Sequence, residues 1–324
     1  RLSAAKRGLS MRDDYGRSIE YLRLSVTDKC NLRCQYCMPE SGVPILPHSD
    51  ILRVEECVAI AEAAVSLGIT KIRITGGEPL VRKGILEICR GIGALPGLGE
   101  LCLTTNGLLL TRYAKDLHAA GVDRLNISLD TLDAAKYRRI TRWGEFKDAW
   151  AGIEAAEAAG FDNIKLNAVL MGGVNDDEIP ALVELTRDKP YEVRFIELMP
   201  IGECAHWEKA RFLPAETVLA ACPALVPLPA KGVAERYQMP GYLGTVGLIR
   251  PLSHRFCGDC NRIRVTADGM LKPCLHSSEE ISLRGLAGET LLVAMRAGIT
   301  KKPMSHHMVE RGSDTNRTMN RIGG

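Results

Sequence analysis

Short strand-like segments alternate with longer helix-like segments six times in succession between residues 21 and 200. Tyr21–Thr27 is typical of a strand, because apolar and polar residues alternate along it. Val54–Leu67 has apolar residues at helical spacing, and Gly68 follows as a C-terminal stop signal. Repeated units of this kind, joined by right-handed crossovers, predict a parallel sheet covered by helices that closes partly into a barrel.

The other predicted elements repeat this pattern. Strands are expected at 71–75, 101–105, 124–130, 163–170 and 192–198, and helices at about 82–93, 112–120, 146–159 and 177–187. After residue 200 the chain becomes rich in Pro and Gly, with two short antiparallel strands expected near 236–238 and 245–250. We therefore predict an α/β fold in two regions: an incomplete (β/α)6 TIM-like barrel over 11–200, and a C-terminal extension over 201–324 that caps one mouth.

The predicted strands share an unusual polar face. A parallel strand that is buried on both faces is almost continuously apolar, whereas these strands are apolar on one face only. The other face is predicted to line the barrel lumen. Unpaired buried charges are costly, so this lumen should be hydrated and bind a polyanion; the alternative is that the side chains lie at strand ends and face solvent. The residues are Arg23, Lys71, Arg73, Thr104, Ser128, Lys165 and Arg194.

Composition excludes several classes of protein. The 42 Lys and Arg residues exceed the 39 Asp and Glu residues by only 3, which is too small a surplus to indicate a nucleic-acid partner. No apolar run approaches the roughly 18–20 residues that cross a bilayer. The 11 cysteines follow no secretory leader and indicate the reducing cytoplasm. Five of them lie among apolar neighbours and are interpreted as core residues: Cys57, Cys89, Cys102, Cys204 and Cys222.

Three of the remaining cysteines, Cys30, Cys34 and Cys37, follow directly on the first predicted strand. Three thiolates at this spacing can hold three irons of a [4Fe–4S] cubane and leave the fourth iron open. Structural zinc prefers a closed site with four ligands, and His48 in a Pro-rich loop is the nearby candidate for a fourth. A cluster is the preferred interpretation, and zinc is the alternative.

Cys257, Cys260 and Cys274 form a second group with the spacing Cys-x2-Cys-x13-Cys. By itself this group fits a zinc ribbon that lacks one cysteine as well as it fits a second cluster. Beside the first three-cysteine group, a second cluster with an open iron becomes the preferred interpretation. The pair His306-His307 is interpreted as part of a solvated polar tail.

The first cysteine group, with an aromatic residue before its last cysteine, resembles the radical S-adenosylmethionine superfamily. Gly76-Gly77-Glu78-Pro79 resembles the element of that superfamily that binds the methionine amino group. Within the superfamily the chain is similar to the GTP 3′,8-cyclase family of molybdenum cofactor biosynthesis, from about Tyr15 to Gly324. The matching stretches are Leu22–Asp28, Arg73–Pro79, Leu103–Gly107 and Asn126–Asp130.

The resemblance implies two [4Fe–4S] clusters and S-adenosylmethionine as cofactors, and GTP as substrate. A 5′-deoxyadenosyl radical would remove the hydrogen from C3′ of GTP, and the resulting carbon radical would attack C8 of guanine. The product would be (8S)-3′,8-cyclo-7,8-dihydroguanosine 5′-triphosphate, which cyclic pyranopterin monophosphate synthase receives. The resemblance also implies an external electron donor, no nucleic-acid or membrane partner, and a monomer or homodimer.

The resemblance further implies roles for individual residues, with no catalytic side chain beyond the cofactors. It assigns the binding of S-adenosylmethionine to Tyr36, Gly77, Ser128 and Met199. It assigns GTP to Arg23, Lys71, Arg73, Thr104, Lys165, Arg194, Arg262 and Arg264, and brings the terminal Gly323 and Gly324 into the active site. Two competing hypotheses are a different radical enzyme with an auxiliary cluster, such as one that modifies peptides, and a non-catalytic zinc-binding barrel.

Overall fold

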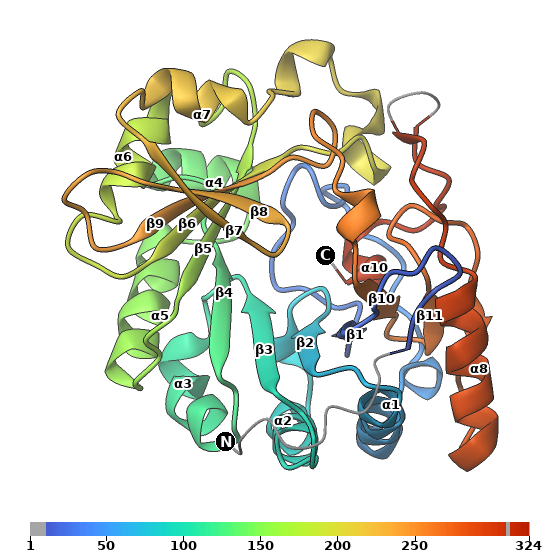
Figure 1. Ribbon diagram of the computed structural model, residues 1–324. Helices are drawn as coiled ribbons and strands as arrows, with labels where there is room; N and C mark the ends of the chain where they lie inside the picture. The colour runs from blue at the N-terminus through green and yellow to red at the C-terminus, as the bar shows by residue number, and fades with distance from the viewer. Residues whose placement is uncertain (1–10, 309–311, 324) are drawn as a thin grey trace.

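The computed structural model describes residues 11–308 and 312–323 (Figure 1). Over these residues the strands form one sheet in the order β12-β11-β10-β1-β2-β3-β4-β5-β6-β9-β8-β7. Strands β1 to β6 are sequential neighbours and pair in parallel. The two ends of this order, β12 and β7, are not paired with each other, so the barrel is incomplete, as predicted.

The six predicted β/α strands are confirmed. They are β1 (Tyr21–Ser25), β2 (Lys71–Thr75), β3 (Glu100–Thr105), β4 (Arg124–Ser128), β5 (Lys165–Leu170) and β6 (Glu192–Glu197). The helices of this region are α1 (Val54–Ser66), α2 (Ile85–Gly93), α3 (Leu110–Ala119), α4 (Ala134–Thr141), α5 (Phe146–Ala158) and α6 (Ile179–Glu184). Helix α4 was not predicted, because it is short and strongly polar, although the Asp133 side chain caps its N-terminus.

The C-terminal region does more than cap a mouth. Its elements are α7 (Glu216–Ala221), β7 (Val226–Lys231), β8 (Ala234–Gln238), β9 (Thr245–Ile249), β10 (Arg262–Val265), β11 (Met270–Lys272), β12 (Ile281–Ser282), α8 (Gly288–Thr300) and α10 (Met319–Ile322). Strand β9 pairs antiparallel with β8, as predicted, but it also pairs in parallel with β6. Strand β10 pairs in parallel with β1. The region thus extends the sheet at both edges, and the predicted division at residue 200 stays a prediction.

The apolar face of the strands packs against the helices. Figure 1 shows α1, α2, α3 and α5 outside the curved sheet. Leu22, Ile72 and Leu101, one from each of the first three strands, are fully buried and belong to one continuous core with residues of these helices. This packing turns the opposite face of each strand toward the lumen. None of the helices in the described ranges is long and apolar enough to cross a bilayer.

Candidate active site

A cavity of about 590 Å³ lies inside the partial barrel. Residues from each of the strands β1 to β6, from the loop after β1 and from the C-terminal region line it. The structure brings both cysteine groups to this one cavity: Cys30, Cys34, Cys37, Cys257, Cys260 and Cys274. It also brings there the residues that the resemblance assigned to ligands: Arg23, Tyr36, Lys71, Arg73, Gly77, Thr104, Ser128, Lys165, Arg194, Met199, Arg262 and Arg264.

Three arginines lie abreast on neighbouring strands. The register pairs Arg23 of β1 with Arg73 of β2 on one side and with Arg264 of β10 on the other. Burial and the nearby Arg264 hold the pKa of Arg23 well below its usual range, and the Nε atom of Arg23 is buried without a hydrogen-bond partner. Like charges directly opposite one another destabilise a sheet, so a negative charge placed against this row would stabilise it.

Two carboxylates that the sequence analysis missed lie among these cations. Glu192 Oε2 accepts from Lys165 Nζ at 2.6 Å, and Glu192 Oε1 accepts from Arg194 Nε at 2.5 Å. Glu100 pairs in the same way with Lys71 and with Arg124, whose Nη2 lies 2.5 Å from Glu100 Oε1. The basic lumen expected from the sequence is therefore partly neutralised. Strand alternation could have found both glutamates, since each shares the inward face of its strand.

These contacts shift the ionisation of the charged groups. Burial and the neighbouring Arg194 lower the pKa of Lys165 to about 7. Burial opposes the ionisation of Glu192, but Arg194 and Lys165 outweigh it and lower the pKa of that carboxyl to about 2. Glu192 thus keeps its negative charge between two cations, and the charge on Lys165 depends on this carboxylate.

Helix α4 positions the N-terminal cysteine loop. The backbone N–H groups of Arg33 and Gln35 donate to the carbonyls of Thr141 and Ile140, at 3.0 and 2.9 Å. Arg142, just after the helix, donates from Nη1 to the carbonyl of Arg33 at 2.9 Å and to that of Met38, also at 2.9 Å. Its φ of 64° lies in the left-handed region, which costs a residue with a Cβ some strain. The unpredicted helix is thus what fixes the loop.

Carboxylates lie close to the same loop. Asp130 accepts from the Tyr36 hydroxyl at 2.9 Å, and burial raises the pKa of Asp130 to about 6. Glu78 accepts from the Asn106 N–H at 2.7 Å and from the Thr105 hydroxyl at 2.8 Å, and burial raises its pKa to about 7. A Cβ at Gly77 would lie 2.4 Å from a backbone oxygen, so the close approach of this segment to the cysteine loop requires glycine.

Basic groups surround the C-terminal cysteines instead. Arg17 donates from Nη1 to the Cys257 carbonyl at 2.8 Å. Lys302 is buried and donates to the carbonyls of Arg262 and Pro273, at 2.8 and 3.0 Å. Burial opposes ionisation of the Cys260 thiol, but Arg262 and Lys302 lower its pKa to about 6. The sequence analysis missed Arg17 and Lys302, since no local motif connects them with these cysteines.

The donor set fits iron–sulfur clusters. The six thiols are free of disulfides and form two groups of three at one cavity, and three thiolates leave one iron of a cubane open. His48, the suggested fourth zinc ligand, is exposed and does not line the cavity. Within the described ranges, no three His, Cys, Asp or Glu side chains converge on a point where they could hold a single metal ion.

The polar C-terminal segment is not a solvated tail throughout. His307 is exposed, but His306 is buried and its ring lies edge-on to His276, with 4.8 Å between the ring centroids. The interpretation was therefore wrong for His306, because the segment folds back over the C-terminal cysteines. The Gly323 carbonyl accepts from Arg264 Nη1 at 3.3 Å. Gly324 lies outside the described residues.

The five scattered cysteines are buried, as predicted. Cys57, Cys89 and Cys222 belong to the main core. Cys204 belongs to a smaller core cluster but also lines the cavity, where its thiol donates to the Tyr36 carbonyl at 3.0 Å. The interpretation as core therefore misses this contact of Cys204 with the site.

Two family models match the chain. The radical SAM superfamily matches residues 24–186, and the molybdenum cofactor synthesis C-terminal family matches residues 191–308. A protein named GTP 3′,8-cyclase from Alkaliphilus oremlandii is 48% identical over 320 residues, which cover 97% of this chain and 100% of that protein. A protein of the same name from Peptoclostridium acidaminophilum is 50% identical over 318 residues, covering 96% of this chain and 98% of the relative.

Among solved structures, the crystal structure of Streptococcus suis SuiB aligns with 93% of this chain and 76% of its own, with a TM-score of 0.59. Its sequence identity is 14%, so the likeness shows a common fold and nothing about the substrate. The relatives, in contrast, match along almost the entire chain at close to half identity. The chain therefore belongs to the GTP 3′,8-cyclase family of the radical SAM superfamily.

Proposed function

We propose that this chain uses S-adenosylmethionine and two [4Fe–4S] clusters to cyclise GTP to (8S)-3′,8-cyclo-7,8-dihydroguanosine 5′-triphosphate, the first step of molybdenum cofactor biosynthesis. One observation carries the proposal: both three-cysteine groups and the basic faces of the strands line the same cavity. Membership of the GTP 3′,8-cyclase family, with relatives of that name, supports the reaction.

The charges of the cavity suit two different ligands. Glu78 and Asp130 lie on the side of the N-terminal cysteines, where each carboxylate raises the pKa of a nearby thiol. Arg262, Arg264 and Lys302 lie on the side of the C-terminal cysteines. S-adenosylmethionine carries a sulfonium, an ammonium and a carboxylate and is a net cation, whereas GTP carries close to four negative charges. Electrostatic complementarity therefore favours the cofactor at the N-terminal group and the nucleotide toward the C-terminal group.

Residues near the N-terminal cysteines would hold the cofactor. With S-adenosylmethionine bound, the cluster on Cys30, Cys34 and Cys37 supplies the one-electron chemistry that starts the reaction. Gly77 lets the segment after β2 approach the cysteine loop, and Asp130 accepts a hydrogen bond from the Tyr36 hydroxyl. The residues proposed to contact S-adenosylmethionine are Tyr36, Gly77, Ser128 and Met199.

The row of arginines would hold the nucleotide. Arg23 and Arg73 lie abreast and supply donors for phosphate oxygens, because guanidinium groups bind such oxygens in pairs. Arg262 and Arg264 lie between Cys260 and Cys274 in the sequence, so guanine would bind on this side of the cavity, where a cluster on the C-terminal cysteines would offer an open iron. The residues proposed to contact GTP are Arg23, Lys71, Arg73, Thr104, Lys165, Arg194, Arg262 and Arg264. With both ligands bound, the wall of the barrel would shield a reactive carbon radical from solvent.

The proposal includes partners of the reaction. The electron that reduces the N-terminal cluster would come from an external donor. The product would pass to cyclic pyranopterin monophosphate synthase. The free thiols fit a reducing compartment, which supports a location in the cytoplasm.

A deuterium-transfer experiment tests the function. Anaerobically reconstituted protein is incubated with S-adenosylmethionine, dithionite and GTP that carries deuterium at C3′. We expect 5′-deoxyadenosine containing one deuterium, together with a nucleotide product that has lost this deuterium and separates from GTP by chromatography. Unlabelled 5′-deoxyadenosine and unchanged GTP would contradict the proposal and favour an enzyme with another substrate. Stoichiometric zinc without iron would favour the non-catalytic barrel.

A further inference from the structure

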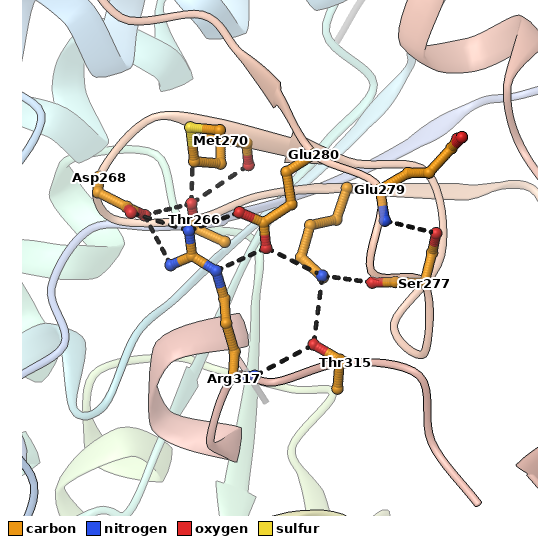
Figure 2. A network of polar contacts seen from close by, with 9 residues as sticks. Thr266, Asp268, Met270, Ser277, Glu279, Glu280, Thr315 and Arg317 are labelled. Carbon is orange, nitrogen blue, oxygen red and sulfur yellow. Dashed lines mark hydrogen bonds and ion pairs between the residues drawn. The ribbon is translucent and has the colours of Figure 1, made fainter.

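One arginine in the segment that leads to Gly323 makes four hydrogen bonds to carboxylates of the C-terminal region. Arg317 donates from Nη1 and Nη2 to both carboxylate oxygens of Asp268, at 3.0 and 2.9 Å. It also donates from Nε and Nη2 to both oxygens of Glu280, at 2.6 and 2.6 Å (Figure 2). Two carboxylates thus grip a single guanidinium with four charge-assisted hydrogen bonds, the geometry in which arginine binds most specifically.

Other groups hold these carboxylates in place. The Thr266 hydroxyl donates to Asp268 Oδ1 at 2.5 Å. Lys272, whose side chain is fully buried, donates to Glu280 Oε1 at 3.1 Å and to the Thr315 hydroxyl at 3.3 Å. The result is a network of two cations and two anions in which each charge has an opposite partner. We call Arg317, Asp268 and Glu280, together with Lys272, the clamp.

The clamp joins the end of the chain to the strands that carry the C-terminal site. Asp268 lies in the turn between β10 and β11, and Glu280 lies just before β12. Strand β10 begins two residues after Cys260 and carries Arg262 and Arg264, and Cys274 follows β11. The end of the chain is therefore fixed to the same hairpin that positions the nucleotide-binding side of the cavity.

Beyond Arg317 the chain enters the cavity. Met319 and Asn320 line it, and the Asn320 amide donates to the Asp28 carbonyl, beside the N-terminal cysteine loop, at 3.0 Å. Gly323 has a φ of 80°, and a Cβ there would lie 2.6 Å from the Thr75 hydroxyl oxygen and 2.9 Å from Ser25. Its carbonyl receives the Arg264 hydrogen bond. The segment after the clamp thus contacts both sides of the site.

We propose that Arg317 is a positioning residue for GTP cyclisation: it holds residues 318–323 at the cavity, so that Arg264 and Gly323 keep the arrangement that GTP requires. This inference rests on the proposed function. Chain ends fray unless they are tied down, and the buried contacts beyond the clamp are few, chiefly Asn320 and Ile322. Without the clamp, radical formation would continue while its coupling to cyclisation is lost.

Hydrogen–deuterium exchange of the peptide that covers residues 318–324 tests the inference without any turnover. In Arg317→Ala we expect exchange at these amides to become roughly ten- to a hundredfold faster, as loss of a charge-assisted contact implies. Arg317→Lys keeps the positive charge but cannot make the paired hydrogen bonds of the guanidinium. It should therefore restore part of the protection of these amides from exchange. The matched control is Arg187→Ala, which removes an exposed ion pair with Glu184 beside helix α6, away from the clamp. Unchanged exchange in Arg317→Ala would overturn the proposal.

Product ratios give the second readout. We expect Arg317→Ala to bind as much iron as wild type but to form several 5′-deoxyadenosine molecules for each cyclised product. Equal coupling in Arg317→Ala and wild type would also overturn the proposal. If Arg317→Ala loses iron or helical structure, the same two measurements are made on Asp268→Asn. This variant leaves the hydrogen bonds between Arg317 and Glu280 intact. Absence of cyclisation in wild type would refute the proposed function. The exchange measurement would still test whether the clamp holds residues 318–323 in place.

Discussion

The two cysteine groups of this cavity have the same number of thiols but opposite electrostatic surroundings. Near the N-terminal group, burial raises the pKa of Cys30 to about 11 and that of Cys37 to about 12, and Glu78 adds to the effect at Cys30. At the C-terminal group, burial also raises the pKa of Cys257, but at Cys260 the cations Arg262 and Lys302 outweigh burial and lower the pKa to about 6. The sequence analysis did not predict this difference in the charges around the two groups.

The difference shows how one cavity can hold two ligands of opposite charge. A cationic cofactor is favoured where Glu78 and Asp130 lie, and an anionic substrate where Arg23, Arg73 and Arg264 lie abreast. Misplacement of either ligand would bring like charges together and is disfavoured. The proposed order of the two ligands along the cavity rests on these charges, and the experiments below test it.

The largest effects are expected from single cysteine substitutions. Wild type should hold about eight irons as two cubanes. Cys30→Ala should abolish 5′-deoxyadenosine formation, whereas Cys257→Ala should retain some uncoupled cleavage of S-adenosylmethionine but lose cyclisation. Iron analysis and chromatography of the products measure both. Identical behaviour of the two variants would refute the division of labour, and stoichiometric zinc after anaerobic preparation would refute the clusters.

Deletion of Gly323 and Gly324 should nearly abolish cyclisation. The Gly323 carbonyl holds Arg264, which belongs to the anionic-ligand side, and the deletion frees this side chain. Folding and both clusters should remain, since two terminal glycines bury no side chain. Thermal unfolding and iron content provide the controls. Full turnover by the shortened protein would mean that the glycines do not act in the site.

Loss of one cation should weaken GTP binding but not cofactor binding. Charge-assisted hydrogen bonds contribute about 1.5–3 kcal/mol each. Lys165→Ala or Arg194→Ala should therefore reduce GTP affinity roughly ten- to a hundredfold, with unchanged iron content and unchanged S-adenosylmethionine affinity. Guanosine should bind poorly to wild type and respond little to either substitution. Calorimetric titrations that show equal affinity for guanosine and GTP would contradict a triphosphate site on this face.

The smallest expected effect is a dependence on pH. The pKa of Lys165 is lowered to about 7, so its amine is charged below pH 7 and increasingly neutral above it. GTP phosphates bind the charged form, and GTP affinity should fall roughly three- to tenfold from pH 6 to pH 8. Lys165→Arg stays protonated and should flatten this slope. The ratio of the two affinities at each pH cancels the titration of GTP itself; a constant ratio would exclude Lys165 as the cause.

Local sequence patterns determined the barrel and much of its lining. Strand alternation requires only neighbouring residues, so the inward placement of Arg23, Lys71 and Arg194 could be predicted from their own strands. Cysteine spacing likewise identified two groups of three thiols. The same alternation contained Glu100 and Glu192, but a basic lumen was expected and the two carboxylates were overlooked, although each pairs with two cations.

Only the tertiary structure decided which distant residues meet. Arg17 reaches the Cys257 carbonyl across 240 residues of sequence, and Asn320 reaches the Asp28 carbonyl across 292. Such contacts follow from β10 joining β1, which closes a loop over most of the chain and has no periodic signature. The physical reason is the separation of these residues in the sequence. Periodicity shows which face a residue occupies on its own helix or strand, whereas the charges around each cysteine group come from distant elements that packing brings together.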